Sequence, residues 1–592
     1  MRSAGLGLLS NIRGDKKATT CIEDTAVALE DLADYIADVE TMLAGFGQRS
    51  VYYAHAGAGE IHLRPVLNLK TAEGNQQFRE ISLASAKLVK QYQGSLSGEH
   101  GDGRLRGEFI PMMVGEENYA LFKRIKNTWD KEHIFNPNKI VNAPSMNTVM
   151  RYTPEKQTPD FQTIIDFSDT GGILQLAEKC NGSGDCRKLP LSGGTMCPSY
   201  MATRDEKETT RARANTLRTF LTENTSPNPF NHKEIKEVMD LCLSCKGCSS
   251  ECPSNVDMSS LKAEFLHQYY KSNGVPLRAK AFAKINQLNR LGAIFPNLSN
   301  FFLSNGLTGD LLKKMLGVAS KRSLPKIQKT SLRNWYKKNY PALKSASKTN
   351  HSLYLFCDEF TNYNDTEIGI KTIKLLARLG YEVKMIAHPE SGRAALSKGL
   401  LPMAKKVAIE NVTIFSKLAS QDVPLVGIEP SAILSFRDEY PRLVAPADRI
   451  KAKTLAKNTF TIEEFLANEI KEGRITSTLF STTQTHILVH GHCHQKALSS
   501  VEHSAWILGL PENYSVEVIP SGCCGMAGSF GYEKEHYDIS MQIGELVLFP
   551  AVRAAKKEVI IAAAGTSCRH QIADGTGRKG LHPIEILYDA LL

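Results

Sequence analysis

The sequence has neither a long apolar run nor an apolar leader. A helix needs about 18 or more consecutive apolar residues to cross a bilayer, and the 592 residues contain no such run, so we expect no membrane span. The first residues also lack the apolar core of a secretory signal peptide. We therefore expect the thirteen cysteines to act as thiolates in a reducing compartment. The predicted location is cytoplasmic, either free or peripheral on the inner face of the plasma membrane.

Acidic residues are absent from residues 311–357. This segment instead carries eleven basic residues: Lys313, Lys314, Lys321, Arg322, Lys326, Lys329, Arg333, Lys337, Lys338, Lys344 and Lys348. They account for the whole net charge of +10. Apolar side chains precede them, so region 280–348 is either a peripheral contact with an anionic membrane surface or a solvated basic linker. No nucleic-acid recognition motif accompanies these charges, and we expect no nucleic-acid partner.

The length predicts a multidomain protein of mixed α+β and α/β class. At about 150 residues a domain, 592 residues allow three or four domains. Residues 1–150 mix strand and helix patterns, with a helix predicted over 25–46, and form the α+β part. Residues 165–275 predict a helical cluster-binding domain, and residues 276–349 a basic helical linker. Beyond these, apolar strands alternate with amphipathic helices, which is typical of parallel α/β packing.

The α/β region repeats itself at an offset of about 135 residues, the size of a small domain. We predict a degenerate cysteine-rich repeat over residues 350–480 and a second repeat over residues 481–592. The first repeat has other residues at three positions that are cysteines in the second: Glu390, Ser391 and Ala432. The second repeat is therefore expected to carry the chemistry and the first to act as a scaffold.

The tightest cysteine run is Cys242-x2-Cys245-x2-Cys248-x3-Cys252-Pro. Thiolates three residues apart can place three sulfurs on one [4Fe–4S] cluster, while the fourth cysteine, followed by proline, is directed to a second cluster. A zinc site, the alternative, would normally need two separated C-x2-C pairs or added histidines. The run therefore predicts electron transfer through iron–sulfur clusters.

A looser motif lies upstream, Cys180-x5-Cys186-x10-Cys197-Pro, with Ser183 where a middle cysteine would stand. In the crossed ligation of two-cluster ferredoxins, Cys197 joins the first three cysteines of the tight run on one [4Fe–4S] cluster. Cys180, Cys186 and Cys252 would hold the other. This second cluster is one thiolate short, so we expect a [3Fe–4S] cluster, a non-cysteine ligand, or no cluster there.

The remaining cysteine set comprises Cys493, Cys523, Cys524 and Cys568. Two adjacent cysteines cannot both bind one face of an ordinary cube without strain, so a non-cubane iron–sulfur centre or a zinc site fits better. A vicinal disulfide and purely structural cysteines are the alternatives. The chain is thus expected to hold one to three iron–sulfur clusters.

Two glycine-rich segments near the start, YYAHAGAGEIHLRP and GSLSGEHGDGRLRGEF, carry histidines and a carboxylate. His55, His62 and Glu99 supply two imidazoles and a carboxylate, a common set for a divalent metal such as zinc or manganese. His100 follows the carboxylate directly. The glycines would let backbone approach a bound ligand closely.

These segments, with CIEDTAVALEDLADYI and HIFNPNKIVNAP, resemble the C-terminal half of FAD-linked 2-hydroxy-acid dehydrogenases of the vanillyl-alcohol-oxidase superfamily. The resemblance covers residues 1–150 and implies a substrate or cap domain. It implies that His55, His62 and Glu99 hold the metal that binds the hydroxy acid, and that His100 is the base that removes the hydroxyl proton. It also places three residues near flavin or substrate: Asn136 and Lys139 for FAD and Arg2 for the substrate carboxylate. The family's main FAD-binding domain precedes this region, so we expect it upstream of Met1 or on a separate flavin subunit.

The rest of the chain is similar to the iron–sulfur subunit of glycolate oxidase and to the cysteine-rich domains of heterodisulfide reductase. The resemblance implies FAD-dependent oxidation of a D-2-hydroxy acid of the D-lactate, D-2-hydroxyglutarate or glycolate class. Electrons would pass through the clusters to a quinone or a carrier protein. Two alternatives remain open: a non-catalytic electron-transfer subunit that docks on a separate flavoprotein, and a thiol–disulfide reductase at the double cysteine.

Overall fold

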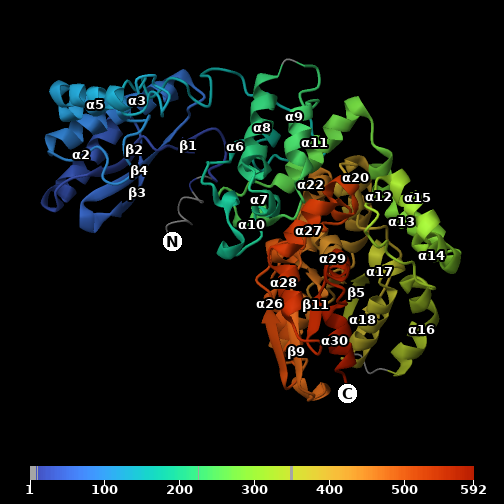
Figure 1. The fold of residues 1–592 in the computed structure, drawn as a ribbon. Coiled ribbons are helices and arrows are strands. Elements are labelled where there is room, and N and C mark those ends of the chain that lie inside the picture. The colour runs from blue at the N-terminus through green and yellow to red at the C-terminus, as the bar shows by residue number, and fades with distance from the viewer. Residues whose placement is uncertain (1–8, 10, 225, 347–350) are drawn as a thin grey trace. The chain divides into compact units, whose positions relative to one another are not determined.

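The computed structural model describes residues 9, 11–224, 226–346 and 351–592. They form two compact units, Met1–Pro159 and Asp160–Leu592 (Figure 1). Each unit is described by itself below. Arg2 lies outside the described residues.

The first unit is built on an antiparallel four-stranded sheet in which β4 pairs with all three other strands. The strands are β1 (Lys17–Ala18), β2 (Ile22–Ala26), β3 (Ser50–His55) and β4 (Glu60–Leu67). The helices are α2 (Leu32–Gly45), α3 (Ala72–Gln91), α4 (Ile110–Val114) and α5 (Glu116–Trp129). The apolar residues of α2 and α3 share one buried core with β2 and β4. The helix predicted over 25–46 is partly wrong, because its first residues pair in β2 and the α-helix begins at Leu32.

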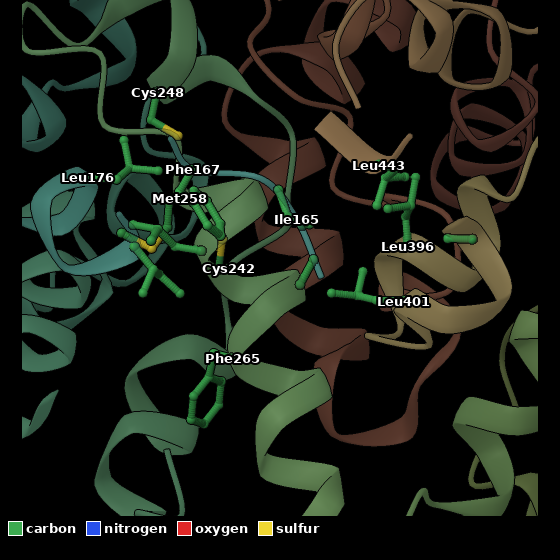
Figure 2. Close-up of a cluster of buried hydrophobic side chains, with 14 of the residues drawn as sticks. Ile165, Phe167, Leu176, Cys242, Cys248, Met258, Phe265, Leu396, Leu401 and Leu443 are labelled. Atoms are coloured by element: carbon green, nitrogen blue, oxygen red, sulfur yellow. The ribbon is translucent and has the colours of Figure 1, made fainter. Parts of the chain in front are cut away.

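The second unit begins with a helical segment that carries seven of the cysteines. Its helices are α6 (Ile173–Glu178), α7 (Pro198–Thr203), α8 (Thr210–Glu223), α9 (Lys233–Asp240), α10 (Gly247–Glu251) and α11 (Met258–Asn273). Side-chain caps fix two of the starts, since Thr209 accepts from the N–H of Ala212 and Asp257 accepts from that of Ser260. Figure 2 shows Cys242 and Cys248 among the apolar side chains of this segment. The same core continues into the α/β part through Leu396, Leu401 and Leu443.

A run of further helices connects this segment to the α/β part: α12 (Leu277–Ala283), α13 (Ile285–Gly292), α14 (Pro296–Ser304), α15 (Gly306–Leu316) and α16 (Leu332–Ala346). The predicted linker is therefore helical over most of its described length. Among the described residues, no helix combines the length and the apolar character needed to cross a bilayer.

The α/β part contains two parallel four-stranded sheets with the same strand order. The order is β6-β5-β7-β8 in one and β10-β9-β11-β12 in the other. The strands of the first sheet are β5 (His351–Phe356), β6 (Tyr381–Lys384), β7 (Leu425–Gly427) and β8 (Thr459–Thr461). Those of the second are β9 (Thr485–His490), β10 (Tyr514–Val518), β11 (Ile560–Ala563) and β12 (Gly580–Leu581).

Helices surround both sheets, and one buried core takes side chains from each of them. The helices between β5 and β9 are α17 (Glu359–Tyr363), α18 (Thr366–Arg378), α19 (Arg393–Ser397), α20 (Leu401–Phe415), α21 (Pro430–Ile433), α22 (Tyr440–Leu443), α23 (Arg449–Lys457) and α24 (Ile462–Lys471). Those after β9 are α25 (Cys493–Leu498), α26 (Glu502–Leu508), α27 (Tyr537–Glu545), α28 (Leu548–Ala554), α29 (Thr566–Thr576) and α30 (Pro583–Asp589). The fold is thus a mixed α/β one, while the five domain boundaries remain predictions.

Candidate functional site

The first unit gathers imidazoles and carboxylates at the junction of β3 and β4. His55 ends β3 opposite Glu60, the first residue of β4, and His62 lies two residues further along the same strand face. The His55 Nε2 lies 3.2 Å from Glu99 Oε1, and the His62 Nε2 lies 4.0 Å from the same oxygen. Ligand atoms of these four residues all lie within 4.8 Å of one another. The predicted metal residues therefore converge, and Glu60 joins them.

The buried members of this cluster have atoms without a hydrogen-bond partner. Glu60 and His62 are 6% and 2% exposed, and Glu60 Oε1 is unsatisfied. Burial, followed by the neighbouring His100 and His55, lowers the pKa of His62. A neutral imidazole beside an unsatisfied carboxylate oxygen is the donor set that a divalent cation takes. These residues therefore fit a metal.

The loop that carries Glu99 and His100 is fixed by one buried carboxylate. Asp24 Oδ2 accepts the backbone N–H groups of Glu99 at 2.9 Å and His100 at 2.7 Å, and Arg106 pairs with Asp24 Oδ1 at 2.9 Å. Burial opposes ionisation of Asp24, but these N–H donors outweigh it and hold the pKa of Asp24 below its usual value. The loop therefore presents both side chains from a rigid backbone.

His100 lies between two carboxylates. Its Nδ1 is 3.3 Å from Glu23 Oε1 and its Nε2 is 3.2 Å from Glu99 Oε1. Glu23 also approaches His62 Nδ1 at 3.2 Å. The side chain of His100 is 48% exposed, whereas that of His62 is 2% exposed. His100 therefore stands at the open mouth of the cluster and His62 at its base.

Asn136 and Lys139 lie in an exposed loop, where Lys139 Nζ donates to Asn136 Oδ1 at 3.3 Å. The next residue, Ile140, donates its N–H to the carbonyl of Gly103 at 3.0 Å. This bond ties the loop to the segment that follows His100. In the described part of the chain, no hydrogen bond or ion pair joins Asn136 or Lys139 to the histidine cluster, and Arg2 lies outside the described residues.

In the second unit, one cavity is lined by the four cysteines predicted for a single cluster: Cys197, Cys242, Cys245 and Cys248. Burial raises the pKa of Cys245 and Cys248, so neither thiol ionises readily without a cation. Four cysteines around one cavity fit a [4Fe–4S] cluster.

A buried arginine from α8 faces this cavity. Arg213 has 0% exposure, its Nη1 donates to Cys197 Sγ at 3.3 Å, and its Nη2 pairs with Glu208 at 2.6 Å. Burial opposes the charge, but Cys197, Cys242 and Glu208 together raise the pKa of Arg213. The cavity therefore contains a fixed positive charge beside the Cys197 sulfur.

Cys180, Cys186 and Cys252 form the neighbouring group. Cys186 Sγ accepts the N–H of Arg211 at 3.4 Å. Burial raises the pKa of Cys186, and the nearby Cys197 and Cys180 add to the rise. The pKa of Cys252 is likewise raised by burial and by Cys180. Cys180 is thus a neighbour of both Cys186 and Cys252, and the crossed ligation stays a prediction.

The C-terminal cysteines are fully buried and share hydrogen bonds. The bond to Cys523 lowers the pKa of Cys493, and bonds to Cys523 and Cys568 lower that of Cys524. The pKa of Cys568 is raised, first by its bond to Cys524. Thiols that share protons in this way ionise together only when a cation offsets their charge, so they fit a metal centre. All thirteen cysteines are free thiols in the structure.

The two cysteine sites adjoin each other. Cys245 packs in one cluster with Cys493 and Cys523. The Nε2 of His494 lies 3.1 Å from the carbonyl oxygen of Ser244, which precedes Cys245. Sequence spacing alone gave no sign of this contact.

The first repeat has a hydrogen-bonded pair where the second has thiols. Glu359, three residues after β5, accepts from the Ser391 N–H at 3.0 Å and from its hydroxyl at 2.7 Å. Cys493 stands three residues after β9, and Ser391 is the predicted counterpart of Cys524. A carboxylate and a hydroxyl therefore satisfy each other at the place where the second repeat needs a cation.

Sequence reasoning missed three residues of these sites: Glu23, Glu60 and Arg213. Glu60 could have been found, because residues two apart on a strand share a face, and Glu60 stands two residues before His62. The other two approach their sites from separate elements, so only the fold reveals them.

Two family models match the chain. The one described as "FAD linked oxidases, C-terminal domain" matches residues 1–140, and the one described as "4Fe-4S dicluster domain" matches residues 179–257. These matches support FAD and 4Fe–4S clusters as cofactors, as the sequence predicts. The divalent metal stays a prediction.

The chain is also similar to whole proteins. D-2-hydroxyglutarate dehydrogenase of Escherichia coli (strain K12) is 28% identical over 642 residues, which cover 100% of this chain and 61% of that protein. D-2-hydroxyglutarate dehydrogenase of Pseudomonas putida (strain KT2440) is 29% identical over 638 residues, with 99% and 60% covered. One subunit of the anaerobic glycerol-3-phosphate dehydrogenase of Escherichia coli (strain K12) is 25% identical over 324 residues, with 54% and 79% covered. The chain thus spans about three fifths of the length of the first two relatives.

Proposed function

We propose that this chain takes part in the FAD-dependent oxidation of a D-2-hydroxy acid and passes the electrons on through iron–sulfur clusters. The observation that carries the proposal is the convergence of His55, His62, Glu99 and His100 above the buried Glu60. The candidate substrate classes are D-lactate, D-2-hydroxyglutarate and glycolate. The names of the two relatives that align with nearly all of this chain favour D-2-hydroxyglutarate.

In this proposal the cluster of His55, His62 and Glu99 holds a divalent metal and His100 is the base. When bound, the metal supplies Lewis acidity toward the substrate hydroxyl and carboxylate, and flavin supplies the hydride acceptor. Glu23 lies 3.3 Å from His100 Nδ1 and would hold the proton there, so that Nε2 would take the hydroxyl proton once Glu99, now 3.2 Å from Nε2, ligates the metal. His62 at the base stays neutral and available as a ligand. Asn136 and Lys139 would contact flavin held by a preceding domain or a separate subunit.

The electron path within the second unit runs from the ferredoxin-type cysteines to the C-terminal cysteine centre. Cys245 lines the first cavity and also packs against Cys493 and Cys523 of the second centre. The neighbouring group of Cys180, Cys186 and Cys252 would hold the other cluster. The acceptor is a quinone or a carrier protein.

The test is anaerobic isolation of the protein from its native cells with flavin, iron, acid-labile sulfide and intact mass measured on one sample. We expect flavin, on this chain or a co-purifying subunit, and roughly eight or more irons per chain. Turnover with D-2-hydroxyglutarate should fall strongly in His100→Asn, whereas His486→Asn, which changes an exposed histidine on β9 of the second unit, should match wild type. Iron without flavin and without turnover would instead favour an electron-transfer subunit. Turnover of small disulfides without turnover of hydroxy acids would favour a thiol–disulfide reductase.

We further propose that α13–α15 contact a membrane surface, where a quinone acceptor would be available. Large apolar side chains are exposed along these helices: Leu288, Leu291, Ile294, Phe295, Leu298, Phe301, Phe302, Leu307, Leu311 and Met315. Basic residues accompany them on α13 (Arg290) and α15 (Lys313 and Lys314), and Asp310 is the acidic residue of the three helices. Apolar side chains flanked by lysine and arginine suit an anionic lipid interface.

Flotation with vesicles tests this contact. Wild type should bind phosphatidylglycerol vesicles more than phosphatidylcholine vesicles, and Phe295→Ser with Phe301→Ser should weaken the binding. Ile450→Ser, which removes an exposed apolar side chain elsewhere in the second unit, should leave it unchanged. Equal flotation of the double variant and wild type would contradict the contact and favour a solvated linker.

A further inference from the structure

A buried histidine lies at the C-terminal cysteine centre. His490 is the last residue of β9, is 1% exposed, and pairs in register with Ala563 of β11. Its ring nitrogen and the sulfurs of Cys524 and Cys568 all lie within 4.8 Å of one another. The end of a parallel strand thus aims an imidazole into the thiol cluster.

One nitrogen of this ring is already occupied and the other is not. The Nδ1 lies 2.7 Å from Ser521 Oγ, and Ser521 in turn donates to the carbonyl of Ile519 at 3.4 Å. With the hydroxyl proton directed at Ile519, the His490 Nδ1–H donates to Ser521 and the lone pair lies on Nε2. The Nε2 is buried, has no nitrogen or oxygen partner, and faces the sulfur of Cys524. An outer hydrogen bond of this type is how proteins orient a metal-bound histidine.

The loop that carries the double cysteine is held close to this ring. Lys496 Nζ donates to the carbonyl oxygens of Ser521 and Gly522, the second at 3.1 Å. Gly525, directly after Cys524, has φ +93, and a Cβ there would lie 2.3 Å from the carbonyl oxygen of Ser540. Ring and thiols are therefore fixed by separate constraints and still converge.

The first repeat provides an internal comparison. Its matching strand β5 has the same length as β9 and ends in Phe356 where β9 ends in His490. That repeat keeps one cysteine, Cys357, but has no counterpart of the double cysteine and closes the position with the Glu359–Ser391 bond. The imidazole at the strand end and the double cysteine are thus present together in one repeat and absent together in the other.

We propose that His490 Nε2 is a ligand of the metal centre formed by Cys493, Cys523, Cys524 and Cys568, which makes it a mixed imidazole and thiolate centre. This inference rests on the metal centre assigned to these cysteines in the proposed function. A neutral imidazole in place of a thiolate leaves the centre less negative, which raises its reduction potential if the metal is iron. Iron and zinc both accept such a ligand set.

The experiment uses the intact protein isolated anaerobically from cells grown with ¹⁵N-histidine. Iron and zinc contents of wild type and Cys524→Ser first identify the metal of the centre. If the metal is iron, pulsed EPR measures the ¹⁵N coupling of the reduced centre. If it is zinc, X-ray absorption at the zinc edge measures the ratio of nitrogen to sulfur ligands. His486→Gln is the matched control, because His486 also lies on β9 and also bonds a serine hydroxyl, but is exposed and away from the thiols.

We expect a nitrogen ligand in wild type and His486→Gln and none in His490→Gln, which should also lose the metal to a chelator on the order of 10-fold faster or more. His490→Cys is the control for a folding defect in His490→Gln, because it replaces the imidazole with another metal ligand. It should keep the metal, show no nitrogen ligand and, for iron, titrate at a lower potential.

Two results overturn the inference. A wild-type centre without nitrogen would do so, and so would a nitrogen ligand that persists in His490→Gln. An unchanged metal content in Cys524→Ser would instead overturn the centre itself, and with it that part of the proposed function. If Cys524→Ser loses the metal but His490→Gln behaves like wild type, the metal centre stands and only the proposed histidine ligand is contradicted.

Discussion

Replacing Arg213 by methionine should change both the stability of the protein and the potential of the adjacent cluster. The guanidinium is fully buried between Glu208, at 2.6 Å, and Cys197 Sγ, at 3.3 Å. Methionine keeps much of the apolar volume but leaves Glu208 buried without its partner. Breaking a buried ion pair on one side costs about 3–5 kcal/mol. The free energy of unfolding of Arg213→Met should fall by that amount.

The electrostatic effect follows from the distance. A unit charge about 6 Å from the centre of a cluster interacts by about 3 kcal/mol at an effective dielectric of about 20, equivalent to about 130 mV for one electron. The positive charge of Arg213 favours the reduced cluster, which carries one more electron. Its removal should therefore lower the midpoint potential by up to about 130 mV, less where the buried Glu208 becomes protonated in response.

The assay is a redox titration followed by EPR of the reduced cluster, with thermal unfolding on the same samples. Arg213→Met with Glu208→Gln should recover part of the lost stability, because no unpaired charge remains. Lys207→Met, whose side chain is 62% exposed, should change neither quantity. A wild-type potential in Arg213→Met would refute the electrostatic reasoning, and a double variant less stable than the single one would refute the ion-pair reasoning.

Two further predictions concern stability. Gly525→Ala should destabilise the protein by more than about 1 kcal/mol relative to Gly528→Ala, since both glycines have positive φ but only the first meets a backbone oxygen at 2.3 Å; equal melting temperatures would contradict this. Burial opposes protonation of His536, but Asp240 at 2.9 Å and Glu533 at 3.0 Å outweigh it and raise its pKa. The stabilisation is therefore full below the unfolded pKa of about 6.5 and is lost as pH rises through the higher folded pKa. The melting temperature of His536→Asn should fall below wild type near pH 5.5 and approach it at high pH; a gap that widens with pH would contradict the assignment.

The sequence predicted best where periodicity and spacing report local structure. The parallel strands near residues 353 and 381 are present, because β5 and β6 are short apolar runs bounded by turns. The spacing of Cys242, Cys245 and Cys248 likewise predicted the shared cavity. The helix over 25–46 was overextended, since pairing of β2 with β4 is a long-range interaction that helical periodicity does not report.

The candidate site was only partly predictable for the same physical reason. Glycine-rich motifs, which are typical of ligand-binding loops, contain His55, His62 and Glu99. Glu23 instead contacts His100 from β2, and no sequence motif surrounds it. Arg213 looks in the sequence like one of several charged residues on an amphipathic helix. Only the packing of α8 against the cysteine loops turns it inward.

Both α/β repeats hold the ferredoxin-type loop, and this gives the repeat without the double cysteine a physical role. Lys246, between Cys245 and Cys248, has a side chain of 0% exposure and pairs with Glu439 of the first repeat at 2.7 Å. From the other side, His494 of the second repeat bonds the carbonyl before Cys245. The loop is thus clamped between an ion pair from one repeat and a hydrogen bond from the other. A scaffold that fixes Cys245 beside the second centre would serve the proposed electron path, although a hydrogen-bonded glutamate and serine stand where the second repeat has thiols.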